Sequence, residues 1–263
     1  MTQTRVFVSL ILIAAALPLT AQTKALSKAK TPVVPPTPQW VETFSEDFNG
    51  TELEFPKWTA HDPWGKERPR EVQAYVPEAL TLADGILRIT ARRGSARYAG
   101  QLREYTSGSV ATWGSFAQTY GKFEIRCRMP AAKGLEPKFW LVPLSGSEIP
   151  SIDVFDAIGS DPTRLLMANR WGDEKTERSF SGSWSDVDFS RDFHTFAVEW
   201  DADKIVWLVD GKERLRATEG IPSQPLCLVI NLAVGGLQAR YPDNSTPLPA
   251  TFEIDYVRVY QRP

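Results

Sequence analysis

One short segment of the chain combines side chains that could carry out acid–base chemistry. It covers residues 150–159, Pro-Ser-Ile-Asp-Val-Phe-Asp-Ala-Ile-Gly, and contains Ser151, Asp153 and Asp156. In a β-strand, residues two apart share a face, so Asp156 joins the face of Ser151 and Asp153 only if a bulge adds one residue. Carboxyl groups brought together in this way can donate and accept protons.

The serine of this segment is a poor nucleophile as it stands. An alcohol attacks weakly unless a neighbouring base activates it, and the sequence offers no obvious base. Of the two histidines, His61 lies in a Pro-rich segment and His194 near a predicted strand start, so both are expected to be structural or exposed. Glu148 could supply a carboxylate in place of the Ser151 hydroxyl, but only if the Ile-Pro dipeptide before Ser151 rearranged.

Composition limits the partners that the chain could take. The formal net charge of -2 over 263 residues gives no electrostatic reason to expect nucleic acid or an anionic membrane. A neutral ligand fits at least as well. The nine tryptophans are the strongest compositional indication of function, because a pyranose ring can stack its C–H face on an indole.

The first part of the chain has the pattern of a targeting segment. Residues 1–21 contain Arg5, an apolar run and small residues before a cleavage point, as in a signal peptide. The apolar run is short and ends at Pro18, so we expect no transmembrane segment after cleavage, and a retained anchor is the alternative. Residues 22–38 have a Lys- and Pro-rich linker composition, which leaves 39–263 as one domain. We therefore expect a secreted or periplasmic protein.

Short alternating segments between turn signals predict an all-β chain. Segments 86–91, 122–129 and 195–200 alternate with period two, and 251–260 does so without Gly or Pro. Segment 204–214 predicts a hairpin that turns at its Asp-Gly dipeptide. Many strands in one domain favour two packed antiparallel sheets or a closed barrel.

The two cysteines, Cys127 and Cys227, each lie in an apolar run. A single bridge and two separately buried thiols are both compatible with this pattern. Neither cysteine has a second Cys or His at ligand spacing, so metal binding through them is not expected.

Eight segments, taken in order, resemble glycoside hydrolase family 16, which includes laminarinases and lichenases. The centre of the resemblance is Gly-Leu-Glu-Pro-Lys-Phe-Trp-Leu-Val-Pro at 134–143, followed by 150–159. The other matching segments are 44–50, 71–75, 119–124, 193–200, 228–236 and 255–260. The resemblance implies an antiparallel β-sandwich of the jelly-roll, concanavalin A-like type, with a polysaccharide cleft on its concave sheet.

The resemblance also implies that the catalytic motif is degenerate. In the laminarinase-like branch, one strand carries a Glu nucleophile, an Asp helper and a Glu acid/base, and these positions hold Ser151, Asp153 and Asp156 here. A retaining glycosidase needs two carboxyl groups about 5–5.5 Å apart. This chain keeps one of that pair, and the shorter Asp156 places its carboxyl about 1.5 Å further back.

Four other residues are implied in ligand binding. Glu71, Trp140 and Trp171 match positions of the family's cleft. Arg170 stands where many relatives resemble Leu-His-Trp-Gly, and it could pair with Asp153 or Asp156, bind an acidic sugar, or be a surface arginine.

The resemblance implies no required cofactor and no obligatory protein partner, so a monomer is expected. A structural calcium ion occurs in some relatives. Backbone oxygens near the equivalents of Glu46 and Gly85 and the equivalent of Asp255 hold it there. Hard-cation sites need six or more oxygens, most of them from the backbone in this case.

Three functions remain open from the sequence. The first is a polysaccharide-recognising protein, similar to endo-β-1,3(4)-glucanases, that keeps the cleft but has lost the nucleophile. The second is an active hydrolase that uses Asp156 with Glu148 or Asp153. The third, a structural domain without a glycan, is disfavoured by the retained cleft residues. The serine at position 151 favours the first.

Overall fold

The computed structural model describes residues 39–173 and 175–263, so the predicted signal peptide and linker lie outside the described residues. Within these ranges, sixteen strands and one 3-10 turn, η1 (Pro77–Ala79), form two sheets. No helix in this part of the chain is long and apolar enough to cross a membrane. The predicted all-β class and antiparallel sandwich are confirmed.

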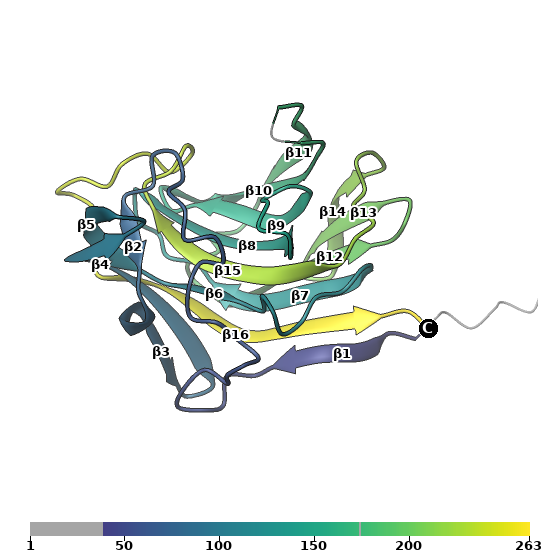
Figure 1. Cartoon of the computed structure of the whole chain (residues 1–263), viewed down its shortest axis with the longest axis horizontal. Helices are drawn as coiled ribbons and strands as arrows, with labels where there is room; N and C mark the ends of the chain where they lie inside the picture. The colour runs from purple at the N-terminus through teal and green to yellow at the C-terminus, as the bar shows by residue number, and fades with distance from the viewer. Residues whose placement is uncertain (1–38, 174) are drawn as a thin grey trace, which may run out of the picture. The chain divides into compact units, whose positions relative to one another are not determined.

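The larger sheet has the order β14-β13-β12-β7-β16-β4-β5-β2, with β1 paired to β16 and β3 to β4. Figure 1 shows β1 and β16 side by side, which brings the start and the end of the described chain together. Its strands are β1 (Val41–Glu46), β2 (Gln73–Tyr75), β3 (Leu80–Ala83), β4 (Ile86–Tyr98), β5 (Gln101–Ser107), β7 (Gly121–Arg128), β12 (His194–Trp200), β13 (Ile205–Val209), β14 (Lys212–Ala217) and β16 (Ala250–Gln261).

The smaller sheet has the order β11-β10-β9-β8-β15-β6. Its strands are β6 (Ser109–Ala111), β8 (Leu135–Pro143), β9 (Ser151–Ile158), β10 (Asp161–Trp171), β11 (Arg178–Ser185) and β15 (Leu226–Val234). Its strand pairs are antiparallel.

Local sequence signals agree with these elements. The alternating segments fall within β4, β7, β12 and β16. The hairpin of β13 and β14 turns at Asp210 and Gly211, whose φ angles of 49° and 72° are those that an Asp-Gly turn adopts readily.

Aromatic side chains between the two sheets form the core. Phe155 of β9 contacts Phe139 of β8 in its own sheet and, from the larger sheet, Phe196 of β12 and Phe252 of β16, with ring centroids 4.9–6.5 Å apart. All four rings are fully or almost fully buried. Because one face of β9 is anchored in this way, the opposite face is held in a defined position.

Strand β9 contains the predicted bulge. Phe139 and Trp140 are neighbours on β8, yet they pair with Phe155 and Asp153, so Val154 is the extra residue. A bulge disrupts the sheet ladder, and the carbonyl of Asp153 accepts a hydrogen bond of 2.8 Å from Trp207 Nε1 of the larger sheet. The bulge returns Asp156 to the face of Asp153, as the spacing required.

The two cysteines are free and buried, Cys127 on β7 and Cys227 on β15. Of the two alternatives left open, the structure has two separate thiols. Burial raises the pKa of both, that of Cys227 to about 12. Both are therefore in the unreactive thiol form at neutral pH.

Candidate functional site

The face of the smaller sheet that points away from the core carries charged side chains, and these side chains line a cavity. Along β8, Glu136, Lys138 and Trp140 alternate with buried core residues, so these three share the face that points away from the core. They line a cavity of about 210 Å³. The other lining residues come from the loop before β2, from β9, β10 and β15, and from the segment after β15: Arg68, Pro69, Glu71, Glu148, Asp156, Arg170, Asn231, Ala233, Gly236, Leu237 and Gln238.

Asp153 lies beneath this face between two cations. It is 2% exposed, and its carboxylate lies 3.2 Å from Lys138 Nζ and 2.8 Å from a guanidinium nitrogen of Arg170. The negative charge of Asp153 raises the pKa of Arg170. Of the alternatives for Arg170, the structure has the pairing with Asp153, and the side chain is 29% exposed.

Ser151, at the nucleophile position, is fully buried. Its Oγ has no hydrogen-bond partner among the described residues, so no base is placed to activate it. Its register partner on β10 is Arg170, a permanent cation that cannot accept a proton. The geometry therefore gives Ser151 no means of acting as a nucleophile.

Asp156 lies beside a carboxyl group that the sequence analysis did not single out. Glu136 is two residues from Lys138, the register partner of Asp156, so Glu136 and Asp156 lie on the same face of adjacent strands and both line the cavity. Burial, followed by the charge of Asp156, raises the pKa of Glu136 to about 9. Burial also raises the pKa of Asp156. Both shifts favour the protonated form of the pair.

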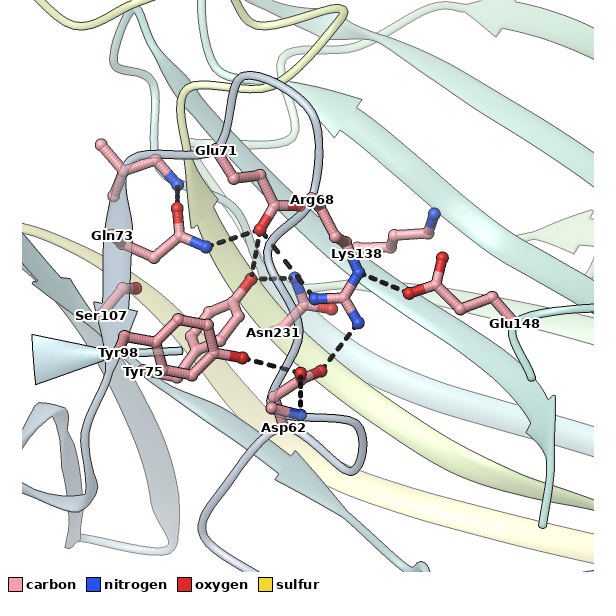
Figure 2. A network of polar contacts seen from close by, with 12 residues as sticks. Asp62, Arg68, Glu71, Gln73, Tyr75, Tyr98, Ser107, Lys138, Glu148 and Asn231 are labelled. Carbon is pink, nitrogen blue, oxygen red and sulfur yellow. Dashed lines mark hydrogen bonds and ion pairs between the residues drawn. The ribbon is translucent and has the colours of Figure 1, made fainter. Parts of the chain in front are cut away.

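Arg68 connects several acidic residues at the edge of the cavity, as Figure 2 shows. Its guanidinium group lies 2.8 Å from Asp62 and 2.9 Å from Glu148, and 4.0 Å from Glu71. Asp62 is 4% exposed and accepts a second hydrogen bond from Tyr98 of β4 at 2.7 Å. The loop before β2 is therefore tied both to the larger sheet and to the loop before β9.

Glu71 is oriented by a chain of hydrogen bonds visible in Figure 2. Its Oε2 accepts from Gln73 Nε2 at 2.6 Å and from the Tyr75 hydroxyl at 3.4 Å. Asn231 donates to Tyr75 and accepts from Trp140 Nε1, each at 3.0 Å. Burial raises the pKa of Glu71, although Arg68 opposes the shift. The chain links Glu71 to Trp140 across the cavity wall.

Trp140 lines the cavity, as predicted, but it is covered more than a stacking platform would be. It is 3% exposed, and the ring of Trp64 lies 5.2 Å away at an angle of 36°. Lys138 Nζ lies 4.5 Å from its centroid. Only an edge of the Trp140 ring therefore remains for a ligand unless Trp64 moves.

The structure does not bring Trp171 into the cavity. Arg170 points to the cavity side of β10, so its neighbour Trp171 points to the other side of the sheet. There it packs on Gly220, where an added Cβ would lie only 2.0 Å from the indole. The expectation of a ligand-facing Trp171 does not agree with this geometry, because the side chains of a strand alternate.

The carboxyl groups around β9 are not arranged as a hydrolytic pair. Glu148 does line the cavity, yet Arg68 binds it, and Asp153 is held by two cations. Asp156 has Lys138 Nζ 3.7 Å away and Glu136 as its neighbouring carboxyl group, and Ser151 stands at the position of the second carboxylate of a retaining pair. The alternative of hydrolysis by Asp156 with Glu148 or Asp153 is not favoured.

The expected calcium ligand, Asp255, forms an ion pair with Arg126. Among the described residues, no three His, Cys, Asp or Glu side chains are grouped as a metal site. The predicted calcium site relied mainly on backbone oxygens, and it remains a prediction.

Sequence reasoning missed Glu136, Lys138, Arg68 and Trp64. Glu136 and Lys138 carried a usable signal, because charged residues two apart in an otherwise apolar strand indicate one polar face. Arg68 and Trp64 lie in a loop outside the named strands, where no periodicity indicates a direction.

Comparisons with known proteins agree with this fold. A sequence model described as Glycosyl hydrolases family 16 matches residues 78–258. The chain is 34% identical over 240 residues to the Endo-1,3-1,4-beta-glycanase EglC of Rhizobium meliloti (strain 1021), which covers 83% of this chain and 51% of EglC. The chain thus spans about half the length of that curated relative.

Two solved structures are similar over most of the chain. The catalytic domain of an endo-1,3-beta-glucanase (laminarinase) from Thermotoga petrophila RKU-1 has a TM-score of 0.78 and 28% identity, with 86% of this chain and 99% of that chain covered. A glutamate-to-serine variant of LamA from Zobellia galactanivorans, in complex with laminaritriose and laminaritetraose, has a TM-score of 0.75 and 27% identity, with 84% and 98% covered.

Proposed function

Because the chain belongs to the glycosyl hydrolases of family 16, we propose that its cleft binds a neutral β-glucan without hydrolysing it by the family's two-carboxylate route. The ligand class follows from the relatives, which act on β-1,3- and mixed-linkage glucans by their names. The cavity supplies suitable groups: an aromatic edge from Trp140 and hydrogen-bonding carboxyl and amide groups from Glu71 and Asn231.

One observation carries the proposal: the position that needs a nucleophile holds a buried serine whose Oγ has no partner among the described residues, while the walls around it keep their polar groups. Loss of a carboxylate at one position removes a reacting group, whereas binding depends on many contacts. The glutamate-to-serine variant of LamA supports this distinction between reaction and binding, because its structure was solved in complex with two laminari-oligosaccharides.

We further propose that the protein is exported, secreted or periplasmic. The support is the sequence of residues 1–21, which has the charge, apolar run and small residues of a signal peptide.

The test is titration of the mature chain with laminarin and with mixed-linkage glucan, followed by tryptophan fluorescence. We expect saturable binding, and we expect Trp140→Ala and Glu71→Gln to weaken it roughly tenfold, which corresponds to about 1.4 kcal/mol. Trp140→Ala removes an aromatic edge, and Glu71→Gln is nearly isosteric and removes a charged acceptor.

Trp40→Ala is the matched control, since Trp40 lies just before β1 under Arg262 and does not line the cavity. Thermal unfolding shows whether each variant is folded. Reducing-sugar release from the same glucans measures hydrolysis, for which we expect no turnover. Absence of binding to every glucan, with folded protein, would refute the proposal.

A further inference from the structure

The Glu136–Asp156 pair is the feature of the cavity that the proposed function leaves unexplained. Glu136 comes from β8 and Asp156 from β9, and both line the cavity of about 210 Å³. Asp156 also lines a second cavity of about 440 Å³ on the side of β10 and β11. The pair therefore lies between the two cavities, where a bound chain that extends from one to the other would pass over it.

The surroundings of the two carboxyl groups favour a proton within the pair. Asp156 Oδ1 is buried and has no conventional donor among the described residues. Lys138 Nζ lies 3.7 Å from the other oxygen, Asp156 Oδ2, and the neighbouring carboxyl group is Glu136, so a proton on Glu136 would give Asp156 a further donor. Two ionised carboxylates at this separation would repel each other strongly, and burial adds to the cost.

Other contacts hold Glu136 in place. Its Oε2 accepts a hydrogen bond of 3.3 Å from the backbone N–H of Ala239. Gly236 has a φ of 113°, which favours glycine, and a Cβ added there would lie 2.5 Å from the same oxygen of Glu136.

The cations that line the cavity are all paired. Lys138 and Arg170 bind Asp153, and Arg68 binds Asp62 and Glu148. An anionic sugar would find no cation among these residues without breaking an ion pair, and it would face the negative charge of the carboxyl pair. A neutral hydroxyl group, in contrast, can donate to the pair directly.

We propose that the Glu136–Asp156 pair is a recognition element for the hydroxyl groups of a neutral sugar, which it binds while holding one proton between its two carboxyl groups. This inference rests on the proposed function and names residues that determine its specificity. It also disfavours the acidic sugar that Arg170 suggested from the sequence.

Several groups face the pair and could contribute to its titration. They are Lys138 of β8, Asp153 of β9, Arg170 of β10, and Arg68, Glu71 and Glu148 of the two loops. A variant that removes the titration of Glu136 alone therefore separates the contribution of the pair from that of the surrounding groups. Glu136→Gln does so, because its amide can still donate to Asp156 but cannot ionise.

The first experiment detects the proton without a ligand. Infrared difference spectra of the wild-type protein minus Glu136→Gln at about pH 7 should contain the C=O band of a protonated carboxyl group. Glu213→Gln, at an exposed glutamate on β14, is the control and should give only a carboxylate difference. A carboxylate difference for Glu136 as well would overturn the inference.

The second experiment measures binding to laminarin between about pH 7 and pH 10. Wild-type affinity should fall roughly tenfold as the pair loses its proton near pH 9, because two carboxylates then repel each other. Glu136→Gln cannot ionise at this position, so its affinity should fall far less than that of the wild type between about pH 7 and pH 10. Glu136→Leu should bind weakly throughout, and a polyuronate should bind to none of the three.

The outcomes separate this inference from the proposed function. No binding of laminarin by folded wild-type protein would refute the function itself. Binding that is equal in wild type, Glu136→Gln and Glu136→Leu, with the same pH profile, would leave the function in place and overturn the role of the pair. Preference for the polyuronate would also overturn it.

Discussion

Ser151 and Arg170 face each other across β9 and β10, at the position where the family's nucleophile acts. Arg170 binds the carboxylate of Asp153, and Lys138 binds it from the other side. An ammonium group and a guanidinium group have no acceptor for a proton, so neither cation can serve as a base. At the scale of single residues, the reaction centre is therefore a cluster of ion pairs. It lacks the two carboxyl groups that a retaining glycosidase needs.

Restoring the pair should restore hydrolysis. We expect the double variant Ser151→Glu with Asp156→Glu to release reducing sugar from laminarin at a rate at least about a hundredfold above the wild type, because one carboxyl can then attack and the other protonate. Each single variant lacks one partner, so the effects should be strongly non-additive.

Glu136→Gln belongs in the same series, since Glu136 binds the residue at position 156 and would hold a new acid away from the ligand. Its addition to the double variant should raise the rate further. Turnover by the unmodified protein would contradict the assignment of Ser151 as a lost nucleophile, and Glu148→Gln would then show whether Glu148 replaces it.

At the scale of elements, the loop before β2 forms one wall of the cavity and is held mainly by Arg68. That side chain is 14% exposed and joins Asp62 near β4 to Glu148 near β9. Trp64, in the same loop, covers Trp140. Arg68 therefore joins this wall to two other parts of the molecule, and its planar guanidinium group allows it to bind several carboxylates at once.

Arg68→Ala should release this wall. We expect faster hydrogen exchange in residues 61–72, a loss of about 2–4 kcal/mol in the free energy of unfolding because Asp62 is left buried without its cation, and weaker glucan binding. Arg97→Ala, at an exposed position of β4, is the matched control. Unchanged hydrogen exchange in residues 61–72 would contradict this expectation and would show that the apolar contacts of Trp64 are sufficient to hold the loop in place.

At the scale of the whole molecule, the buried carboxyl groups link stability to pH. Burial raises the pKa of Glu136, Asp156 and Glu71, so the folded protein binds more protons than the unfolded chain above the ordinary pKa of these groups. The free energy of unfolding must then fall as pH rises. For Glu136 the window extends from its ordinary value of 4.5 to about 9.

Urea unfolding at several pH values tests this linkage. Wild-type stability should decrease through that window with a contribution from Glu136 of at most about 1.4 kcal/mol per pH unit. Glu136→Gln should remove that contribution, so its stability relative to the wild type should increase with pH. Parallel curves for the two proteins would mean that Glu136 titrates normally and that the pair does not hold a proton.

The sequence by itself determined the class of fold, several of the strands and the family. Alternation, the Asp-Gly turn and the bulge spacing between Asp153 and Asp156 are local properties, because strand geometry sets which residues share a face. The ordered motifs predicted the sandwich and its cleft. The buried state of the two cysteines was also evident, although the choice between a bridge and separate thiols was not.

Only the tertiary structure decided which groups meet in the cleft. The Glu136–Asp156 pair joins two strands, and Arg68 reaches acidic groups that are six and eighty residues away in sequence. The tertiary structure also directs Trp171 to the other side of the sheet. The reason is physical: the protonation and partners of a carboxyl group depend on burial and on neighbours at hydrogen-bond distance, and the folded chain supplies those neighbours from separate strands and loops.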